Sequence, residues 1–525
     1  MLWVGFHFPS LSLEAFSALL GHERAGEPIA LQAQHRIAAV NAAAAEGGVK
    51  AGMKRATALA LVPELILGTA DPLRDAEALQ AAAHALLAFS PTVVPAPPHG
   101  LLIEVQASLR CFGGLARLWQ RLAEALAPLG HRWQRASAPT ALGALLLARE
   151  AHQADPPAAL TRSPLCLAEP AWDDLHQRLW RLPAAALATD ASALAQFEAM
   201  GLRTLGDLRR QPRAGLARRF GPELLTMLDR AWGLVPDPLE PIAPPLRFLS
   251  HADLWARADH TEALLAGAQV LLARLLAWAQ ARHARVQSFV LLLHHESRLR
   301  ANSQGEAGAH VSRLEIMLAE PTGDAQHLHA VLRERLAREP LAAPVLSLSL
   351  ACDAPVLGPP PNGELFPSQA GQREGLLRLV ERLQARLGPE AVQRLAVQAD
   401  HRPERANARQ SFTAPDKTAS FTFATPGATP NATLSALPAR LTRPAWLLAQ
   451  PQPLMERQAR PCLAGQPLHL LAGPERIETG WWDGDLVCRD YFIAQPADGP
   501  LLWIYRVRPA PPQGEPGWFL HGRFG

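Results

Sequence analysis

Two histidines lie where the chain could hold a metal ion, and few acids accompany them. His7 closes the apolar stretch that opens the chain, and His99 precedes the apolar run 101–105; both stretches predict β-strands. Two-metal phosphoryl transfer needs carboxylates, because hard Mg²⁺ ions prefer anionic oxygen ligands. The nearby acids are Glu14 and Glu104 alone. We expect no metal and no other cofactor here, with a transition-metal site from the two histidines as the alternative.

A second set of side chains could contact phosphate groups. Arginines gather between residues 203 and 219, close to predicted helix starts at Thr204 and Pro212. Guanidinium groups and helix N-termini both bind phosphates without reading sequence. The alternative is a solvated face in a protein that uses arginine almost in place of lysine. The candidate DNA-binding residues are Arg203, Arg209, Arg210, Arg213, Arg218 and Arg219.

The Pro/Gly-rich segment 357–372 contains an apolar pair, Leu365 and Phe366, with no core of its own to enter. Peptides that bind the bacterial sliding clamp place such a Leu-Phe pair in an apolar pocket of the clamp. We expect this pair to bind the clamp, although Asn362 or Gly363 stands where a glutamine often begins such peptides. The alternative is that the pair folds back onto its own domain.

Composition limits the class of protein. The chain has 525 residues, a net charge of +3 and a pI of about 8.7, so several domains fit and any nucleic-acid surface must be local. Its five cysteines form no CxxC pair, which favours a reducing cytoplasm over a zinc or disulfide framework. Neither a membrane-spanning helix nor a signal peptide is expected from the apolar patterning.

Apolar spacing predicts strands alternating with helices in the first 150 residues and short helices over 171–240. A second α+β region follows, and the last 80 residues regain aromatic density, which favours a small β-rich unit. An amphipathic helix is expected beyond the linker, with Leu376, Leu379, Leu383 and Leu387 on one face. In the second α+β region we expect helices over 261–281 and 324–337 and strands over 286–293, 313–318 and 345–350.

Residues 1–350 resemble the Y-family (UmuC/DinB-like) DNA polymerases. The segments that carry the resemblance are VGFHFPSLSLE, GGVKAGMKRATALALVPEL, LLIEVQASLRCFGG, ASAPTALGALLLARE and LPAAALATDASALAQFEAMGLRTLGDLRRQPRAGLARRFG. The C-terminal GPERIETGWWDGDLVCRDYFIA and WFLHGRFG narrow it to the polymerase-like accessory proteins of bacterial mutagenesis cassettes. The resemblance implies an α+β multidomain fold, a right hand of palm, fingers, helical thumb and little finger with a C-terminal extension.

The resemblance also implies domain boundaries. They are palm-like 1–30 and 67–170, fingers-like 31–66, thumb-like 171–240, little-finger-like 245–355, a linker with the candidate clamp motif over 356–375, and a C-terminal partner-interaction region over 376–525, of which 400–440 is expected to be irregular. The thumb-like part carries a degenerate helix-hairpin-helix, because Ala184-Ala185-Ala186 fills the place of the family's glycine hairpin. Little-finger-like candidates for DNA contact are Arg282, Arg285, Arg298 and Arg300.

The departures from the family pattern concern its chemistry. The family's first strand reads D-x-D, and this chain has His7-Phe8-Pro9; the family's second acidic pair aligns with His99 and Gly100. The fingers of the family hold the triphosphate with a tyrosine and an arginine, which become Ala42 and Ala45. Both losses predict that catalysis and nucleotide binding are gone.

The sequence thus predicts a non-catalytic, cytoplasmic adaptor in damage-induced (SOS) translesion synthesis and mutagenesis. The resemblance implies four partners: primer-template DNA, the sliding clamp, a RecA-like protein of the ImuA type and an error-prone C-family DNA polymerase. Two alternatives remain open at this point, an active translesion polymerase with relocated metal ligands and a DNA-binding repair factor without clamp contact. The aromatic C-terminal unit is either an ordinary β-rich core or a docking surface.

Overall fold

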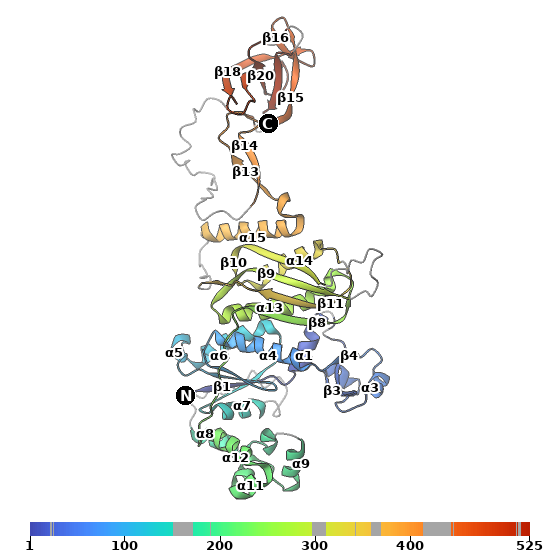
Figure 1. The fold of residues 1–525 in the computed structure, drawn as a ribbon, viewed down its shortest axis with the longest axis vertical. Coiled ribbons are helices and arrows are strands. Elements are labelled where there is room, and N and C mark those ends of the chain that lie inside the picture. The colour runs from blue at the N-terminus through green and yellow to red at the C-terminus, as the bar shows by residue number, and fades with distance from the viewer. Residues whose placement is uncertain are drawn as a thin grey trace. The chain divides into compact units, whose positions relative to one another are not determined.

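The computed structural model describes residues 1–21, 24, 26–150, 172–188, 191–296, 311–341, 343–358, 369–412, 443–444, 446–510, 512 and 516–524 (Figure 1). The chain divides into two compact units, the N-terminal unit Met1–Arg386 and the C-terminal unit Leu387–Gly525. Helices and sheets mix in the first, and strands dominate the second. The predicted α+β multidomain architecture with a β-rich C-terminal part is confirmed.

The first sheet of the N-terminal unit is antiparallel and has the strand order β5-β6-β1-β7. Its strands are β1 (Trp3–His7), β5 (Val93–Ala96), β6 (Gly100–Glu104) and β7 (Gln134–Ala138). Helices α1 (Leu11–Ser17), α4 (Pro72–Leu87) and α6 (Leu115–Leu126) cover one face, and α7 (Ala141–Glu150) covers the other (Figure 1). Because both faces are covered, the central strands β1 and β6 are mostly apolar and buried. Two shorter elements, η1 (Ala18–Leu20) and α5 (Leu109–Phe112), follow α1 and β6.

A small sheet of order β3-β2-β4 carries two short helices. These elements are β2 (Ile29–Ala33), β3 (Arg36–Val40), α2 (Ala42–Glu46), α3 (Arg55–Leu61) and β4 (Ile66–Thr69). Asn41 caps α2, since its Oδ1 accepts the N–H of Ala44 at 2.9 Å. The same oxygen accepts the N–H of Ile29 at 3.0 Å, which fixes the start of α2 against β2.

Short helices follow the first sheet and share its α7-side core. They are α8 (Trp172–Arg181), η5 (Ala184–Leu187), α9 (Ala191–Ala199), α10 (Leu205–Arg210), α11 (Arg213–Phe220) and α12 (Pro222–Ala231). Thr204 and Asp207 form a capping box at the start of α10, which is the helix start that the sequence predicts. Pro212 is the N-cap residue of α11, the other predicted helix start, and makes no side-chain cap.

The second sheet has the order β10-β9-β11-β8, with β12 added to β9. Its elements are β8 (Phe248–Ala258), η6 (Thr261–Leu264), α13 (Leu265–Ala281), β9 (Ala284–His295), β10 (Val311–Thr322), α14 (Ala325–Arg338), β11 (Val345–Cys352) and β12 (Val356–Leu357). Helices α13 and α14 pack on one face and enclose the largest apolar core. The helices and strands predicted for this region are confirmed.

One helical stretch, Thr261–Ala281, is long and apolar enough to cross a membrane by length and composition alone. In this fold it packs as a core helix, because Leu271, Leu275 and Trp278 are completely buried against the second sheet. It also contains Arg274, whose guanidinium pairs with Glu77 of α4.

Helix α15 (Gln369–Leu387) is present where an amphipathic helix is predicted, but its leucine row does not face a core. The exposed fractions of Leu379, Leu383 and Leu387 are 52%, 37% and 55%, whereas Leu377 and Val380 on another face are buried. Apolar spacing identifies the helix and cannot tell which of two apolar faces is covered.

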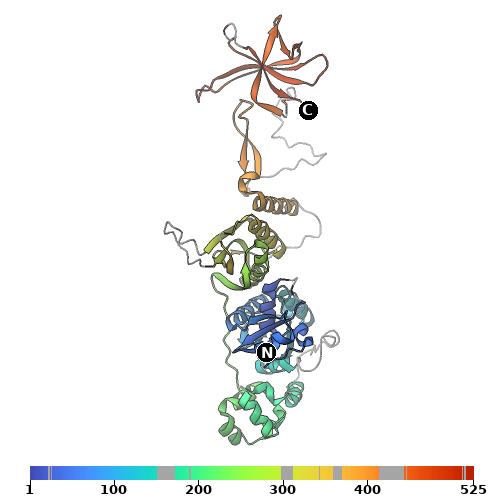
Figure 2. The ribbon, with the colours of Figure 1, turned by 90° about the vertical axis from the view of Figure 1, so that its right-hand side faces the viewer.

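The C-terminal unit holds η7 (Pro389–Ala391), a two-stranded hairpin and a strongly twisted seven-stranded sheet of order β17-β16-β15-β21-β20-β19-β18 (Figure 2). The strands are β13 (Gln393–Val397), β14 (Asn407–Ser411), β15 (Trp446–Arg457), β16 (Arg460–Leu463), β17 (Gln466–Pro467), β18 (His469–Thr479), β19 (Val487–Gln495), β20 (Leu502–Val507) and β21 (Trp518–Arg523). The expectation of irregular structure over 400–440 is wrong at β14, which pairs with β13. Residues 413–440 lie outside the described residues.

Candidate functional site

The positions of the family's metal-binding acids come together at one end of the first sheet. His7 ends β1 and pairs with Gly100, the first residue of β6. The Nδ1 atom of His7 lies 3.3 Å from the carbonyl oxygen of His99, and the N–H of Phe8 donates to the same oxygen at 2.9 Å. The positions that match the family's two acidic motifs, far apart in the sequence, therefore lie side by side in the fold.

A polar network surrounds His99. Ser12 of α1 donates a hydrogen bond to Asp75 of α4, and the Ser12 oxygen lies 3.5 Å from Nε2 of His99. Burial lowers the pKa of His99; Asp75 opposes that shift and Arg149 adds to it. The imidazole is therefore neutral near pH 7. Sequence reasoning missed Ser12, Asp75 and Arg149, because no local pattern links three separate helices to one strand end.

Gly100 leaves no room for the acid that the family has there. A Cβ atom at this position would lie 2.6 Å from the carbonyl oxygen of Ala96 and 2.8 Å from Cδ1 of Leu145. Real Cβ atoms do not approach a backbone oxygen this closely, so the turn before β6 would have to move. A side chain at position 100 is therefore incompatible with this turn.

Glu14 and Glu104, the two acids named from the sequence, are not available at this strand end. Glu104 ends β6 opposite Trp3, four residues from Gly100, which corresponds to about 13 Å along the strand. Its Oε1 accepts the N–H of Gln106 at 3.1 Å. Glu14 binds the Arg132 side chain at 2.7 Å. Among the residues that the structure describes, no group of three or more histidines, cysteines or acids could hold a metal ion.

The nucleotide-binding positions of the family lie on α2. Ala42 and Ala45 are one helical turn apart and both are exposed, so they share an open face. A methyl group neither donates a hydrogen bond nor carries charge. At these two positions α2 therefore presents only methyl groups.

The six arginines predicted to bind DNA divide into two groups. Arg213 makes a two-pronged pair with Asp229, at 2.9 and 2.5 Å, and Arg210 pairs with Asp207 at 3.2 Å. Arg209 lies over the ring of Trp232, with its guanidinium carbon 4.9 Å from the ring centre. The remaining three are exposed and make no ion pair within the described residues: Arg203, Arg218 and Arg219.

Several other predicted contacts have different outcomes. Arg282 donates a hydrogen bond to the carbonyl of Pro245 at 3.1 Å and lies over Trp278. Part of its guanidinium is therefore already engaged in contacts within the protein. The segment Ala184-Ala185-Ala186, which fills the place of the family's glycine hairpin, begins the 3-10 turn η5. The clamp-binding candidates Leu365 and Phe366, and the arginines Arg298 and Arg300, lie outside the described residues.

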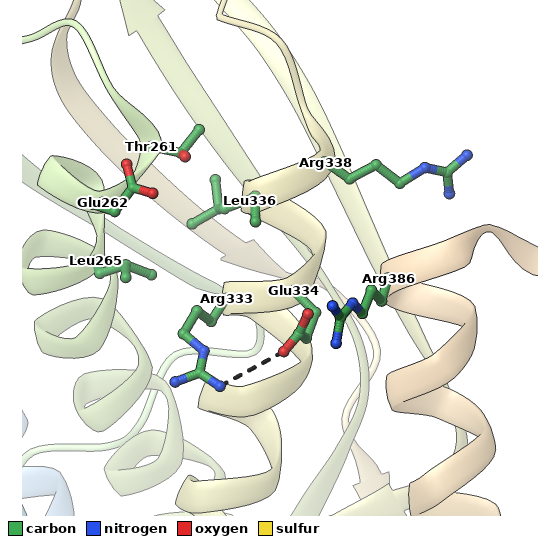
Figure 3. Close-up of a pocket in the computed structure, with 9 residues that line it drawn as sticks. Thr261, Glu262, Leu265, Arg333, Glu334, Leu336, Arg338 and Arg386 are labelled. Atoms are coloured by element: carbon green, nitrogen blue, oxygen red, sulfur yellow. Dashed lines mark ion pairs between the residues drawn. The ribbon is translucent and has the colours of Figure 1, made fainter.

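A pocket of about 510 Å³ opens at the ends of three helices of the N-terminal unit (Figure 3). Glu262 lines it from the start of the α13 helical stretch, Arg333 and Glu334 from α14, and Arg386 from α15. Arg333 and Glu334 form an ion pair of 3.6 Å. None of the predicted site residues lines this pocket.

Comparison with known proteins agrees with the resemblance seen in the sequence. The model of the impB/mucB/samB family matches residues 14–141. Protein ImuB of Caulobacter vibrioides, in each of two strains, is 27% identical over 504 residues, which cover 91% of this chain and 100% of the relative.

Solved structures also match the chain. Dbh DNA polymerase in an insertion ternary complex is 15% identical with a TM-score of 0.37, and the match covers 68% of this chain and 100% of that one. DinB from Sulfolobus solfataricus gives 15% identity, a TM-score of 0.35 and the same coverage. The family match over residues 14–141 and the ImuB match, rather than these scores, together support an ImuB-like protein related to the Y-family DNA polymerases.

Proposed function

We propose that this protein is a non-catalytic adaptor in translesion DNA synthesis, which holds primer-template DNA and recruits an active polymerase. The ImuB-like relationship gives it a polymerase-related role in mutagenesis. The observation that carries the rest is the strand end at His7 and Gly100: neither residue has a carboxylate, and a Cβ has no room at Gly100. Asp75 accepts a hydrogen bond from Ser12 near His99, and this single carboxylate falls short of the acids that hold two metal ions.

The domains follow from the same reasoning. We assign the first sheet to a palm, the small sheet to fingers, the short helices to a thumb and the second sheet to a little finger, with the boundaries given by the resemblance. The clamp, a RecA-like protein of the ImuA type and an error-prone C-family polymerase are the partners proposed with DNA. The cytoplasm and the damage-induced SOS response are the proposed setting.

Primer extension tests the lack of catalysis. We expect no nucleotide incorporation by the purified protein with Mg²⁺ or Mn²⁺, because acids are missing from the strand end and the open face of α2 is methyl-lined. Template-dependent extension that disappears in Glu104→Ala would contradict the proposal and favour relocated ligands. The position of Glu104 at the far end of β6 argues against that rival.

DNA binding is expected to be weak, sensitive to salt and neutral to sequence. Replacing Arg218 and Arg219 with alanine should lower the slope of log affinity against log salt by about 2, because each lost phosphate contact removes roughly one unit. Fluorescence anisotropy with primer-template at several salt concentrations measures this slope. The control Arg457→Ala with Arg460→Ala removes the same charge from exposed positions of the C-terminal unit. An equal fall in this slope in both variants would show a non-specific effect of charge.

Clamp binding is expected to depend on the linker pair. Leu365→Ala with Phe366→Ala should abolish binding to the sliding clamp, because burying each side chain contributes about 1.5–3 kcal/mol to a short-peptide contact. Titration of the clamp measures it. Val356→Ala with Leu357→Ala is the matched control, since both are exposed apolar residues at the start of the linker. A melting temperature lowered by the first double change would instead support folding back onto the domain.

A further inference from the structure

Helix α15 presents two apolar faces, and the described residues cover only one of them. The covered face holds Leu377, Val380 and Ala385, all buried. The second is a row of leucines at every fourth position, Leu379, Leu383 and Leu387, the last of which ends the helix. Residues spaced by four lie one above the other on a helix. The row therefore forms a continuous apolar stripe about 12 Å long.

Polar contacts as well as packing hold the covered face of α15 against the second sheet and α14. The Glu381 carboxylate is buried, lies 2.5 Å from Nε2 of His327 on α14, and accepts the N–H of Ala319 on β10. Arg378 pairs with Asp324, the N-cap of α14, at 2.8 Å. These contacts fix the rotation of α15 about its own axis. The leucine row consequently faces solvent, because turning it inward would break the buried contact of the Glu381 carboxylate.

A row of arginines runs beside the leucine row. Arg378, Arg382 and Arg386 follow the same four-residue spacing, one position before each leucine. Arg382 and Arg386 are exposed and form no ion pair within the described part of the chain. Arg386 also lines the pocket in Figure 3. The carboxylate in this stretch of α15, Glu381, is turned inward to His327 and leaves the outer face cationic.

We propose that the outer face of α15, formed by the leucine row with Arg382 and Arg386, docks a helix of a partner protein. The partner helix would have an apolar row of its own, bordered by Asp or Glu. Apolar rows in register with flanking opposite charges are how helices pair and choose partners. A second copy of α15 fits poorly, because it would bring arginine rows together. DNA fits poorly too, because phosphates gain nothing from exposed leucines. The proposal does not depend on the lack of catalysis.

Two synthetic helical peptides test the proposal against the full chain. Both carry leucines at every fourth position; one has glutamates beside them and the other has lysines. We expect the glutamate peptide to bind and Leu379→Ser with Leu383→Ser to weaken it by about tenfold or more. Reversing the charges with Arg382→Glu and Arg386→Glu should switch the preference to the lysine peptide. Fluorescence anisotropy of the labelled peptides provides the measurement.

Matched controls separate this face from general stickiness. Leu249→Ser removes a leucine that is 72% exposed on the second sheet and should leave the affinity unchanged. Thermal unfolding should be the same for every variant, since all four altered side chains on α15 are exposed. Equal binding of the two peptides, or indifference to the charge reversal, would overturn the proposal. So would stronger α15-dependent binding to vesicles of phosphatidylglycerol and phosphatidylcholine than to the glutamate peptide, or self-association through α15 in sedimentation equilibrium.

Discussion

Replacing Glu77 with alanine is expected to destabilise the N-terminal unit by about 3 kcal/mol, the usual cost of leaving one buried charge without its partner. Glu77 lies on α4 and pairs with Arg274 of α13, whose side chain is 7% exposed. The Arg274 guanidinium also donates to the Ser250 hydroxyl at 3.0 Å and to the carbonyl oxygen of His251 at 3.2 Å. The contact joins helix α4, which covers the first sheet, to helix α13, which covers the second sheet.

The electrostatics explain why this single change matters. Burial lowers the pKa of Arg274, and the neighbouring Glu77 carboxylate opposes that shift. Without Glu77, the guanidinium stays in an apolar interface with only neutral acceptors. Ser250 also loses an acceptor, because its hydroxyl donates to Glu77 at 2.9 Å. Thermal and urea unfolding of the full chain measure the loss.

A second variant distinguishes the ion pair from simple packing. Arg274→Met combined with Glu77→Gln removes both charges and keeps most of the volume, so it should recover most of the stability lost in Glu77→Ala. Arg282→Met is the matched single control, since Arg282 is near the end of the same helical stretch and lies over Trp278. If Glu77→Ala unfolds at the same temperature as the unaltered chain, the contact does not hold the two layers together.

Much of the secondary structure could be read from the sequence, because it depends on local patterns. The apolar runs at β1 and β6 and the long apolar periodicity of α13 have simple periods of two or about 3.6 residues. The glycine at 201 has a positive φ of 70° and closes the turn after α9, which is the predicted helix stop. These features need no information from distant parts of the chain.

The misses come from distant contacts. The outward leucine row of α15 depends on Glu381 meeting His327, 54 residues earlier. Strand β14 is short and polar, and its partner β13 defines it. A single sequence cannot show which of two apolar faces is covered or which short polar segment finds a partner strand.

The candidate site was predictable where it rests on aligned positions and unpredictable where it rests on packing. The resemblance brought His7 and Gly100 to one strand end, and the fold does the same. It could not show that the Ala96 carbonyl fills the space beside Gly100. Nor could it show that Arg210 pairs with Asp207 of its own helix and Arg213 with Asp229 of the next helix, because an arginine-rich sequence looks the same whether the charges are paired or free.

Replacing Arg402 with methionine is expected to lower the melting temperature of the C-terminal unit by on the order of 10 °C. Arg402 is 1% exposed, and its guanidinium binds Asp400 at 2.7 Å and Asp483 at 2.5 Å. It also donates to the backbone carbonyl of Asp485 at 3.2 Å, which anchors the turn over 480–485. At Gly480, where φ is +86°, a Cβ would lie 2.0 Å from that carbonyl, so the turn is tightly constrained.

The same cluster should make stability depend on acid. The hydrogen bond from Arg402, opposed by burial, lowers the pKa of Asp483 from its ordinary 3.8 to about 2. A carboxyl group with a depressed folded-state pKa adds stability above its ordinary pKa and loses it as pH falls through the folded value. The unaltered unit should therefore lose stability between about pH 4 and pH 2, and Arg402→Met should lose less over that range.

The turn that Arg402 holds carries Trp481 and Trp482, with exposed fractions of 77% and 52%, so their fluorescence reports on it. We expect Arg402→Met to change tryptophan emission and raise the accessibility of the indoles to acrylamide before the sheet unfolds. Arg457→Met is the matched control, because Arg457 is exposed in β15 of the same unit. If the two variants melt together and show the same acid dependence, the buried guanidinium does not hold the turn.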